Sequence, residues 1–374
     1  MMLNRCVRLL LAAVLCLSSG ILVAQEIRIG VVASLTGPAA GFGREYVDGF
    51  EAYVRDWNRR GGAGGARIVL DVLDDETSPV GAVTAFRRLA DRTDVAVVWL
   101  AISSNSALAI KPLSTEYGIP ILTSGAVDAL GIPAAPYFFK VMPAAKDFVY
   151  AMLEWARGKE IKRIAAILPS DAYGQAEAQH FRELVPKFGM ELVASESFAN
   201  SDTSMTSQLI KIRNAKPGLI YSGATGGPAV LIYKAYKQIG INAPIALSTG
   251  ALNKSFFDAT GPSAEGLLTP TLLGALGPQV GGAAAKIFGE MTSVLARSGT
   301  IYNAFGWDHG VITEAAMKQG RTRQQIRQGL EQLKDLPTIG GPVAYSAENH
   351  TGLDHRGIGM ARFAGSRFEP LTDR

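Results

Sequence analysis

The sequence predicts an α/β protein built from two doubly wound lobes, each formed around a parallel β-sheet. Short apolar strands alternate with helices along almost the whole chain, a rhythm typical of βαβ units. The rhythm restarts after Pro143, where a long helix leads to a new apolar strand. The 374 residues also exceed the size of about 250–300 residues at which single hydrophobic cores stop growing, so two lobes are expected.

The predicted strands are short apolar runs, and the segments between them carry apolar residues at helical spacing. The first such helix has Val47, Phe50, Val54 and Trp57 on one face. Pro112 lies in a later helix and is expected within its first two turns. The strands are predicted at residues 27–34, 67–73, 95–100, 119–123, 163–168, 191–198, 218–222 and 245–247, and late helices at 283–296, 305–318 and 323–333.

Residues 1–24 have the layout of a secretory signal peptide. Arg5 and Arg8 form a basic start, an apolar run covers residues 9–17, and small residues precede Ala24. A retained membrane anchor is the alternative, but the apolar stretch is shorter than the roughly 20 residues of a spanning helix. The sequence therefore predicts export to the periplasm.

Both cysteines, Cys6 and Cys16, lie in this signal segment. A lipid anchor at Cys16 is disfavoured, because a lipoprotein signal requires a small residue just before the cysteine and Leu15 stands there. Disulfides, thiolate metal sites and cysteine nucleophiles are excluded from the remaining chain.

Charge and motif content argue against nucleic acid and against catalysis. The chain has 37 Lys and Arg against 33 Asp and Glu, and the basic residues are scattered without interleaved aromatics. The pair Gly41 and Gly43 lacks the third glycine and the acidic residue of a dinucleotide fingerprint. The sequence holds no Gly-x-Ser-x-Gly, His-Glu-x-x-His or Gly-Lys-Ser/Thr motif. We expect a binding protein without cofactor or metal.

Two polar clusters could be mistaken for metal sites. The run Asp74-Asp75-Glu76 closes a strand, and a loop role through hydrogen bonds explains it best. Gly352 lies between His350 and His355 and Gly357 follows them, so the sequence favours a turn over a zinc site.

Several motifs carry a family resemblance. The stretch Ser-Leu-Thr-Gly-Pro at residues 34–38 precedes a helix that ends in Asn-Arg-Arg-Gly-Gly at residues 58–62, and residues 171–174 read Asp-Ala-Tyr-Gly. This pattern resembles the branched-chain amino-acid-binding proteins, which are type I periplasmic binding proteins of ABC importers. The resemblance implies a monomer with a Venus-flytrap fold that hands a small ligand to an inner-membrane ABC permease.

The resemblance also implies how the chain is divided between the lobes. The N-terminal lobe is expected to hold residues 25–143 and 273–340, and the C-terminal lobe residues 144–272 and 341–374. The chain then crosses a hinge several times, an interleaving that the strand and helix pattern alone does not reveal.

Candidate ligand contacts lie where strands end and helices begin, because open α/β sheets bind ligands beyond the carboxyl ends of their strands. Ser103 and Ser104 open a helix whose free N–H groups suit a carboxylate without any cation, although a plain helix cap explains one of the two. Gly125 and Ala126 have little bulk, so their backbone can approach a ligand. Thr225 follows a strand in the second lobe.

Three aromatic residues are candidate walls of the ligand pocket. The resemblance implies this role for Phe42 and Phe305 in the first lobe and for Tyr173 in the second. Core packing is the alternative for each of them.

The expected ligand chemistry depends on two polar side chains of the amino-acid-binding relatives that this chain lacks. Amino-acid-binding relatives place an acidic residue where this chain has Thr249, and a Thr or Ser where it has Val127. A buried ammonium group without a counter-charge costs several kcal/mol, so an aromatic or aliphatic carboxylate without an α-ammonium group is favoured. An apolar α-amino acid, and a role as the ligand-sensing subunit of a receptor, remain alternatives.

Overall fold

The computed structural model describes residues 25–252, 254–365 and 367–371. The predicted signal segment with Cys6 and Cys16 lies outside these residues. No helix in the described part of the chain is long and apolar enough to span a membrane.

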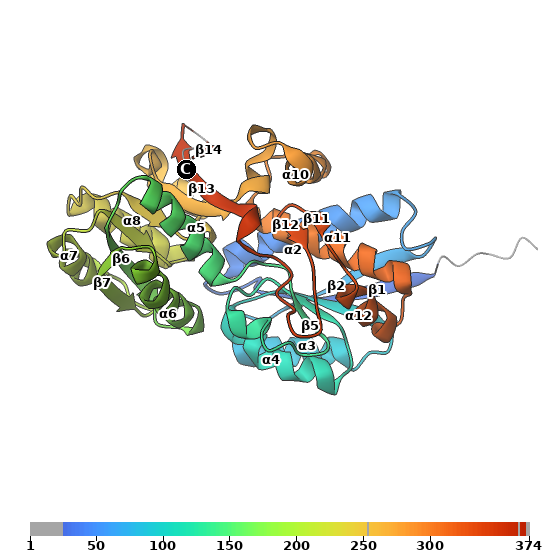
Figure 1. The fold of residues 1–374 in the computed structure, drawn as a ribbon. Coiled ribbons are helices and arrows are strands. Elements are labelled where there is room, and N and C mark those ends of the chain that lie inside the picture. The colour runs from blue at the N-terminus through green and yellow to red at the C-terminus, as the bar shows by residue number, and fades with distance from the viewer. Residues whose placement is uncertain (1–24, 253, 366, 372–374) are drawn as a thin grey trace, which may run out of the picture.

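The first lobe is built on a five-stranded parallel sheet with the order β2-β1-β3-β4-β5 (Figure 1). Helices α2, α11 and α12 cover one face, and α3 and α4 cover the other, so the sheet is doubly wound. The elements are β1 (Glu26–Ala33), α2 (Ala40–Arg59), β2 (Arg67–Asp74), α3 (Pro79–Ala90), β3 (Val95–Ala101), α4 (Ser104–Glu116), β4 (Ile121–Thr123), β5 (Phe138–Lys140), α10 (Gly282–Leu295), α11 (Ile301–Ala316) and α12 (Arg323–Glu331).

The second lobe holds a seven-stranded sheet with the order β14-β13-β10-β9-β8-β6-β7. Strands β6 to β10 run parallel, whereas β13 and β14 are antiparallel additions at one edge, so the expected parallel sheet is mixed. The elements are α5 (Ala145–Gly158), β6 (Arg163–Pro169), α6 (Ala172–Lys187), β7 (Glu191–Phe198), α7 (Thr206–Asn214), β8 (Leu219–Ser222), α8 (Gly226–Gln238), β9 (Ile245–Leu247), α9 (Lys254–Thr260), β10 (Leu268–Leu272), β13 (Ile358–Ala364) and β14 (Arg367–Pro370).

The chain passes between the two sheets after β5, after β10 and after the small hairpin of β11 (Leu336–Thr338) and β12 (Gly341–Val343). Figure 1 shows these passages between the lobes, with α10 to α12 lying beside the N-terminal helices although they come late in the chain. Short 3₁₀ turns complete the described chain: η1 (Asp128–Leu130), η2 (Thr249–Ala251), η3 (Gly261–Ala264), η4 (Leu273–Gln279), η5 (Met317–Gln319) and η6 (His355–Gly357).

The backbones of helices α11 and α2 lie in direct contact where the two helices cross. A Cβ atom on Gly49 would lie 2.3 Å from the Asn303 carbonyl oxygen, and one on Gly306 would lie 2.4 Å from that of Tyr46. The two glycines therefore allow a late helix to dock on the first long helix. This crossing brings the amino-terminal ends of both helices together at the edge that faces the second lobe.

The predicted strands all occur, with ends that shift by at most two residues. Strands β5, β10, β11, β12 and β14 were not predicted, because they are short and carry little alternation, and the longer β13 was not among the predicted strands either. The expected position of Pro112 is wrong: α4 begins at Ser104, which places Pro112 in the third turn.

Candidate functional site

The carboxyl ends of the parallel strands in both lobes lie where the two lobes contact each other, and we call this junction the cleft. In the first lobe, β1 leads to Ser34, β3 to Ser103 and β4 to Ser124. In the second lobe, β6 leads to the helix that carries Tyr173, β8 to Thr225 and β9 to Ser248. Most of the predicted ligand contacts therefore lie on the two edges that face each other.

Contacts across the cleft show that the lobes are closed on each other. The Tyr302 hydroxyl of α11 donates to the Gly250 carbonyl oxygen in the second lobe at 2.5 Å. His180 Nε2 on α6 lies 3.5 Å from Asp128 Oδ2 in η1. Tyr173 packs against apolar residues of the first lobe.

Ser103 and Ser104 stand at the start of α4. Ser103 Oγ caps the helix by accepting from the Ser106 N–H at 3.2 Å, and it donates to Ser106 Oγ at 3.1 Å. Ser104 is nearly buried, and its Oγ lies 3.6 Å from the place that a Cβ on Gly125 would take. The two serines and the loop after β4 thus form one small polar surface.

Gly125 and Ala126 form the loop after β4. A Cβ atom on Gly125 would lie 2.2 Å from Leu130 Cδ1, so a larger residue there would force the buried Leu130 side chain to move. The Ala126 carbonyl oxygen already accepts from Lys140 Nζ at 3.0 Å and from the Ala145 N–H at 3.0 Å. Its carbonyl is therefore occupied, and any ligand contact must use another group of this loop.

Lys140 was missed by the sequence analysis. Its side chain is fully buried, and burial lowers the pKa of its ammonium group to about 8. Nζ also donates to the Val127 carbonyl oxygen at 3.3 Å, so the lysine holds the loop after β4 from behind. A lysine that ends a three-residue strand gives no signal of such burial in the sequence.

The aromatic wall of the first lobe is formed by Phe42 and Tyr302. Their rings stack with centroids 5.7 Å apart, and Phe42 lies in the first turn of α2. Phe305 is placed differently from the expectation: it is 1% exposed and stacks on Tyr46 at 6.1 Å, inside the first core. Tyr302, one turn earlier on α11, occupies the cleft instead.

Tyr173 heads a hydrogen-bonded network in the second lobe. Its hydroxyl donates to Glu177 Oε1 at 2.7 Å and lies 3.2 Å from Ser248 Oγ. The Tyr221 hydroxyl donates to the same oxygen of Glu177. Burial raises the pKa of Glu177 to about 7, although both phenols lower it. Glu177 was also missed by the sequence analysis.

Thr225 and Thr249 both lie next to Gly250 but have different surroundings. A Cβ atom on Gly250 would meet Thr225 Cγ2 at 2.8 Å and the Tyr302 hydroxyl at 3.1 Å, so Thr225 borders the closed cleft. Thr249 is buried, and its Oγ1 lies 3.3 Å from Thr271 Oγ1. It faces a separate cavity rather than the network of Tyr173.

Several known proteins are similar to this chain. The profile of the family described as periplasmic binding protein matches residues 26–363. The chain belongs to the periplasmic binding protein family. A Leu/Ile/Val-binding protein homolog 3 from Brucella melitensis is 26% identical over 245 residues, which cover 65% of this chain and 66% of that relative. The matched part thus spans just under two thirds of that relative.

Solved structures share the fold. An extracellular ligand-binding receptor from Rhodopseudomonas palustris HaA2 is 26% identical with a TM-score of 0.84, covering 92% of this chain and 99% of that one. A solute-binding protein of an ABC transporter from R. palustris, in complex with benzoate, is 20% identical with a TM-score of 0.81, covering 92% and 95%. The resemblance to branched-chain amino-acid-binding type I proteins and the Venus-flytrap fold are confirmed.

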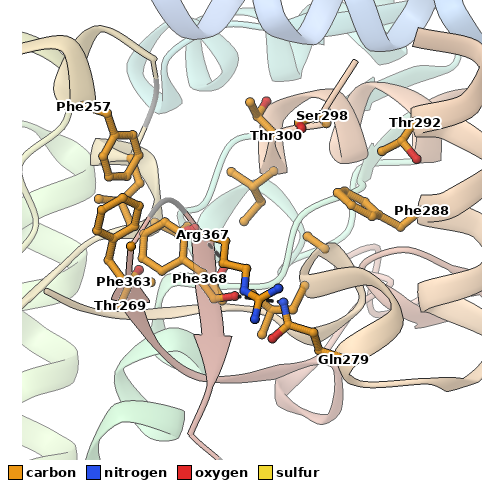
Figure 2. Close-up of a pocket in the computed structure, with 18 of the residues that line it drawn as sticks. Phe257, Thr269, Gln279, Phe288, Thr292, Ser298, Thr300, Phe363, Arg367 and Phe368 are labelled. Atoms are coloured by element: carbon orange, nitrogen blue, oxygen red, sulfur yellow. Dashed lines mark hydrogen bonds between the residues drawn. The ribbon is translucent and has the colours of Figure 1, made fainter. Parts of the chain in front are cut away.

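A cavity of about 1210 Å³ lies beside the cleft of this periplasmic binding protein. Figure 2 shows Phe257, Phe363 and Phe368 on one side and Phe288 and Thr300 across from them. Of the predicted ligand contacts, Thr249 lines this cavity. Its walls come from both lobes.

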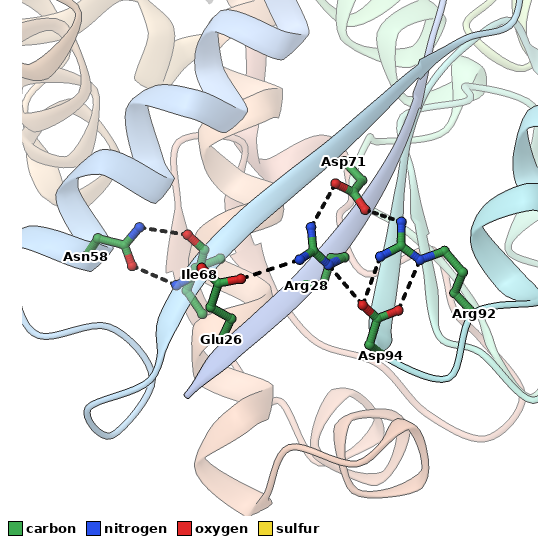
Figure 3. A network of polar contacts seen from close by, with 7 residues as sticks. All are labelled: Glu26, Arg28, Asn58, Ile68, Asp71, Arg92 and Asp94. Atoms are coloured by element: carbon green, nitrogen blue, oxygen red, sulfur yellow. Dashed lines mark hydrogen bonds and ion pairs between the residues drawn. The ribbon is translucent and has the colours of Figure 1, made fainter. Parts of the chain in front are cut away.

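The far edge of the first sheet carries a structural polar network (Figure 3). Arg28 pairs with Asp71 at 3.0 Å and with Asp94 at 3.1 Å, and Arg92 bonds both carboxylates as well. Asn58, part of the family motif, bonds both the N–H and the carbonyl oxygen of Ile68 at 2.8 Å. These residues join strands and helix far from the cleft.

The two clusters that resembled metal sites have other roles. Asp74 accepts from the Leu35 and Thr36 N–H groups and from Thr36 Oγ1, and these bonds lower its pKa although burial opposes them. The His350 ring stacks on Phe139 with centroids 4.0 Å apart, and Asp354 pairs with Arg356. Among the described residues, no group of three or more His, Cys, Asp or Glu could hold a metal ion.

Proposed function

We propose that this periplasmic binding protein is the substrate-binding subunit of an ABC importer and captures a small carboxylate between its lobes. The closed form would be the one presented to an inner-membrane permease. The observation that carries the proposal is the serine-capped start of α4, which faces the cleft at the carboxyl edge of the first sheet. The protein acts as a monomer and performs no chemical step.

The carboxylate would lie at the start of α4. The first N–H groups of a helix lack partners within it, and the helix dipole favours negative charge there. Ser104 adds a hydroxyl within reach of the loop after β4. Ser103 remains a candidate contact, although its Oγ already bonds Ser106.

The body of the ligand would be apolar. The stacked rings of Phe42 and Tyr302 offer a flat wall, and Tyr173 closes from the second lobe. Because Thr249 stands where an acid would neutralise an α-ammonium group, an aromatic or aliphatic acid is favoured. The benzoate-bound structure described above shares the fold of this chain, and its support for the proposal is limited to the fold.

A second candidate is an apolar α-amino acid such as leucine or phenylalanine. The observation that favours it is Glu177, a buried carboxyl group in the second lobe beside Tyr173. An ionised Glu177 could supply the counter-charge that Thr249 does not.

Calorimetry with matched ligand pairs tests the proposal. The pairs are 3-phenylpropanoate with phenylalanine and 4-methylpentanoate with leucine, with benzoate added. We expect at least one acid without an amino group to bind, and to bind more tightly than its partner. Tighter binding of the amino acids by about tenfold, or about 1.4 kcal/mol, would favour the second candidate. Binding of neither class would overturn carboxylate capture.

A further inference from the structure

Glu177 is the buried acid closest to the predicted closing residue of the second lobe. Its side chain is 0% exposed, one helical turn after Tyr173 on α6. Oε1 accepts from the Tyr173 hydroxyl at 2.7 Å and from the Tyr221 hydroxyl at 2.5 Å. Oε2 is buried as well and has no hydrogen-bond partner among the described residues.

This pattern is that of a neutral carboxylic acid. A carbonyl oxygen has two lone pairs, and two phenols fill them at Oε1. The hydroxyl oxygen of such an acid needs one acceptor, and Oε2 has none in the part of the chain that the structure describes. An ionised carboxylate would instead leave the lone pairs of Oε2 unpaired, and only the two phenols at Oε1 would offset its charge, which is costly for a buried anion.

The surroundings of Glu177 supply no positive charge. The titratable groups that act on it are Tyr173 on its own helix, Asp171 just before that helix and Tyr221 on β8, and Asp171 raises its pKa further. No Lys, Arg or His of the described chain contributes to its pKa.

The place of Oε2 is set by Gly223, which follows β8. A Cβ atom on Gly223 would lie 2.1 Å from Oε2, so a larger residue there would displace the carboxyl group from its present position. Gly223 stands at the carboxyl edge of the second sheet, beside the network that contains Tyr173 and Ser248. Oε2 therefore lies against the backbone just beyond the carboxyl end of β8.

We propose that Glu177 is a specificity-determining contact of the cleft, whose neutral carboxyl group donates a hydrogen bond from Oε2 to the carboxylate of an acid bound between the start of α4 and α6. The inference rests on the proposed function, and it assigns one further ligand contact, Glu177, in its protonated form. A donor at this place selects ligands with an oxygen acceptor over ligands with an ammonium group. The ligand's negative charge in turn favours the protonated form of Glu177.

Binding is then linked to pH. With a pKa of about 7, Glu177 is mostly neutral at pH 6 and mostly ionised at pH 8. Ionisation removes the donor and places two negative charges together. We expect the affinity for an acid to fall by about tenfold from pH 6 to pH 8.

Two variants separate the donor role from other roles. Glu177→Gln keeps an acceptor for the phenols and an N–H donor at the second position but cannot ionise. It should bind the acid about as well as the wild type at pH 6 and should not weaken at pH 8. Glu177→Leu lacks the donor and should lose about tenfold in affinity at pH 6. Glu183→Gln, at an exposed position on the same helix, is the matched control and should behave as the wild type.

The probes are benzoate, 3-phenylpropanoate and 4-methylpentanoate, measured by calorimetry with phenylalanine and leucine beside them. The inference is overturned if Glu177→Gln retains the pH dependence, if Glu177→Leu binds the acid unchanged, or if Glu177→Gln loses binding of an amino acid that the wild type prefers. The last result would assign Glu177 as an ionised partner of ammonium.

A measurement without ligand tests the neutral state of Glu177 separately from the proposed function. Infrared difference spectra of the wild type and Glu177→Gln at pH 6 should contain a protonated-carboxyl band that Glu183→Gln leaves in place. Absence of the band overturns the neutral acid even if every acid binds. Failure of all acids to bind, with the band present, would count against the proposed function alone.

Discussion

Ser103 uses one oxygen both to begin a helix and to border the proposed carboxylate site. Its Oγ accepts from the Ser106 N–H at 3.2 Å, the usual geometry of a serine cap. The cap aligns the free N–H groups at the start of α4. Loss of the hydroxyl therefore affects stability and binding through the same group.

We predict that Ser103→Ala weakens acid binding by roughly 1–3 kcal/mol, because a hydrogen bond to a charged ligand or the alignment of its donors is lost. Calorimetry measures this loss. The matched control is Thr322→Ala, which removes the cap of α12 near the amino end of β3. Both variants should lose about 1 kcal/mol of stability. Equal affinities in the two variants would remove Ser103 from the site.

Glu177 also makes stability depend on pH. Its pKa is raised from 4.5 to about 7, mainly by burial, so the native state keeps a proton that the unfolded chain releases between these values. The free energy of unfolding should therefore fall as pH rises from about 4.5 to 7.

Urea denaturation at pH 5 and pH 8 tests this expectation. The wild type should lose more stability between the two pH values than Glu177→Gln does. Asp308, whose pKa burial also raises to about 7, is present in both proteins, so its contribution cancels in the comparison. An equal loss in both proteins would mean that Glu177 does not titrate in this range.

At the scale of elements, the contact between α2 and α11 builds the aromatic wall. Gly49 and Gly306 let the helices approach until their backbones touch. Phe42 on one helix then stacks on Tyr302 of the other. The wall thus depends on two glycines that do not face the ligand.

We predict that Gly306→Ala destabilises the protein by about 1–3 kcal/mol, because the new methyl group would overlap the Tyr46 carbonyl oxygen. Chemical denaturation measures the change. Gly289→Ala in α10, where a Cβ meets nothing within 4 Å, is the control and should be neutral or gain up to about 1 kcal/mol. Similar stability of both variants would contradict the tight crossing.

At the scale of the whole molecule, closure depends on bonds that exist only when the lobes meet. The bond from Tyr302 to the Gly250 carbonyl and the approach of His180 to Asp128 are of this kind. A ligand that contacts both lobes adds to them and shifts the population toward the closed form.

Small-angle scattering tests hinge closure directly. We predict that the radius of gyration of the protein falls when a binding acid is added, because the ligand is held from both sides. Tyr302→Phe, which lacks the bond to Gly250, should have a larger radius without ligand than the wild type. Equal radii with and without saturating ligand would argue against closure.

The sequence by itself determined the order of strands and helices and the junctions that face the cleft. The spacing of apolar residues and the length of an apolar run are local properties of the sequence, so β1, β3 and β6 could be predicted from them. The residues just after these strands, Ser103 and Tyr173 among them, could then be placed at the cleft edge by a general rule of α/β sheets.

Only the tertiary structure decided which side chains reach the cleft. Tyr302 and Phe305 are three residues apart on one face of α11, and docking on α2 places the first in the cleft and the second in the core. The burial and hydrogen bonding of Glu177 depend on Tyr221 in β8 and on Gly223 just after it, which are distant in the sequence. Burial and hydrogen bonding arise from contacts between residues that are far apart in the sequence. Local sequence patterns therefore do not predict them.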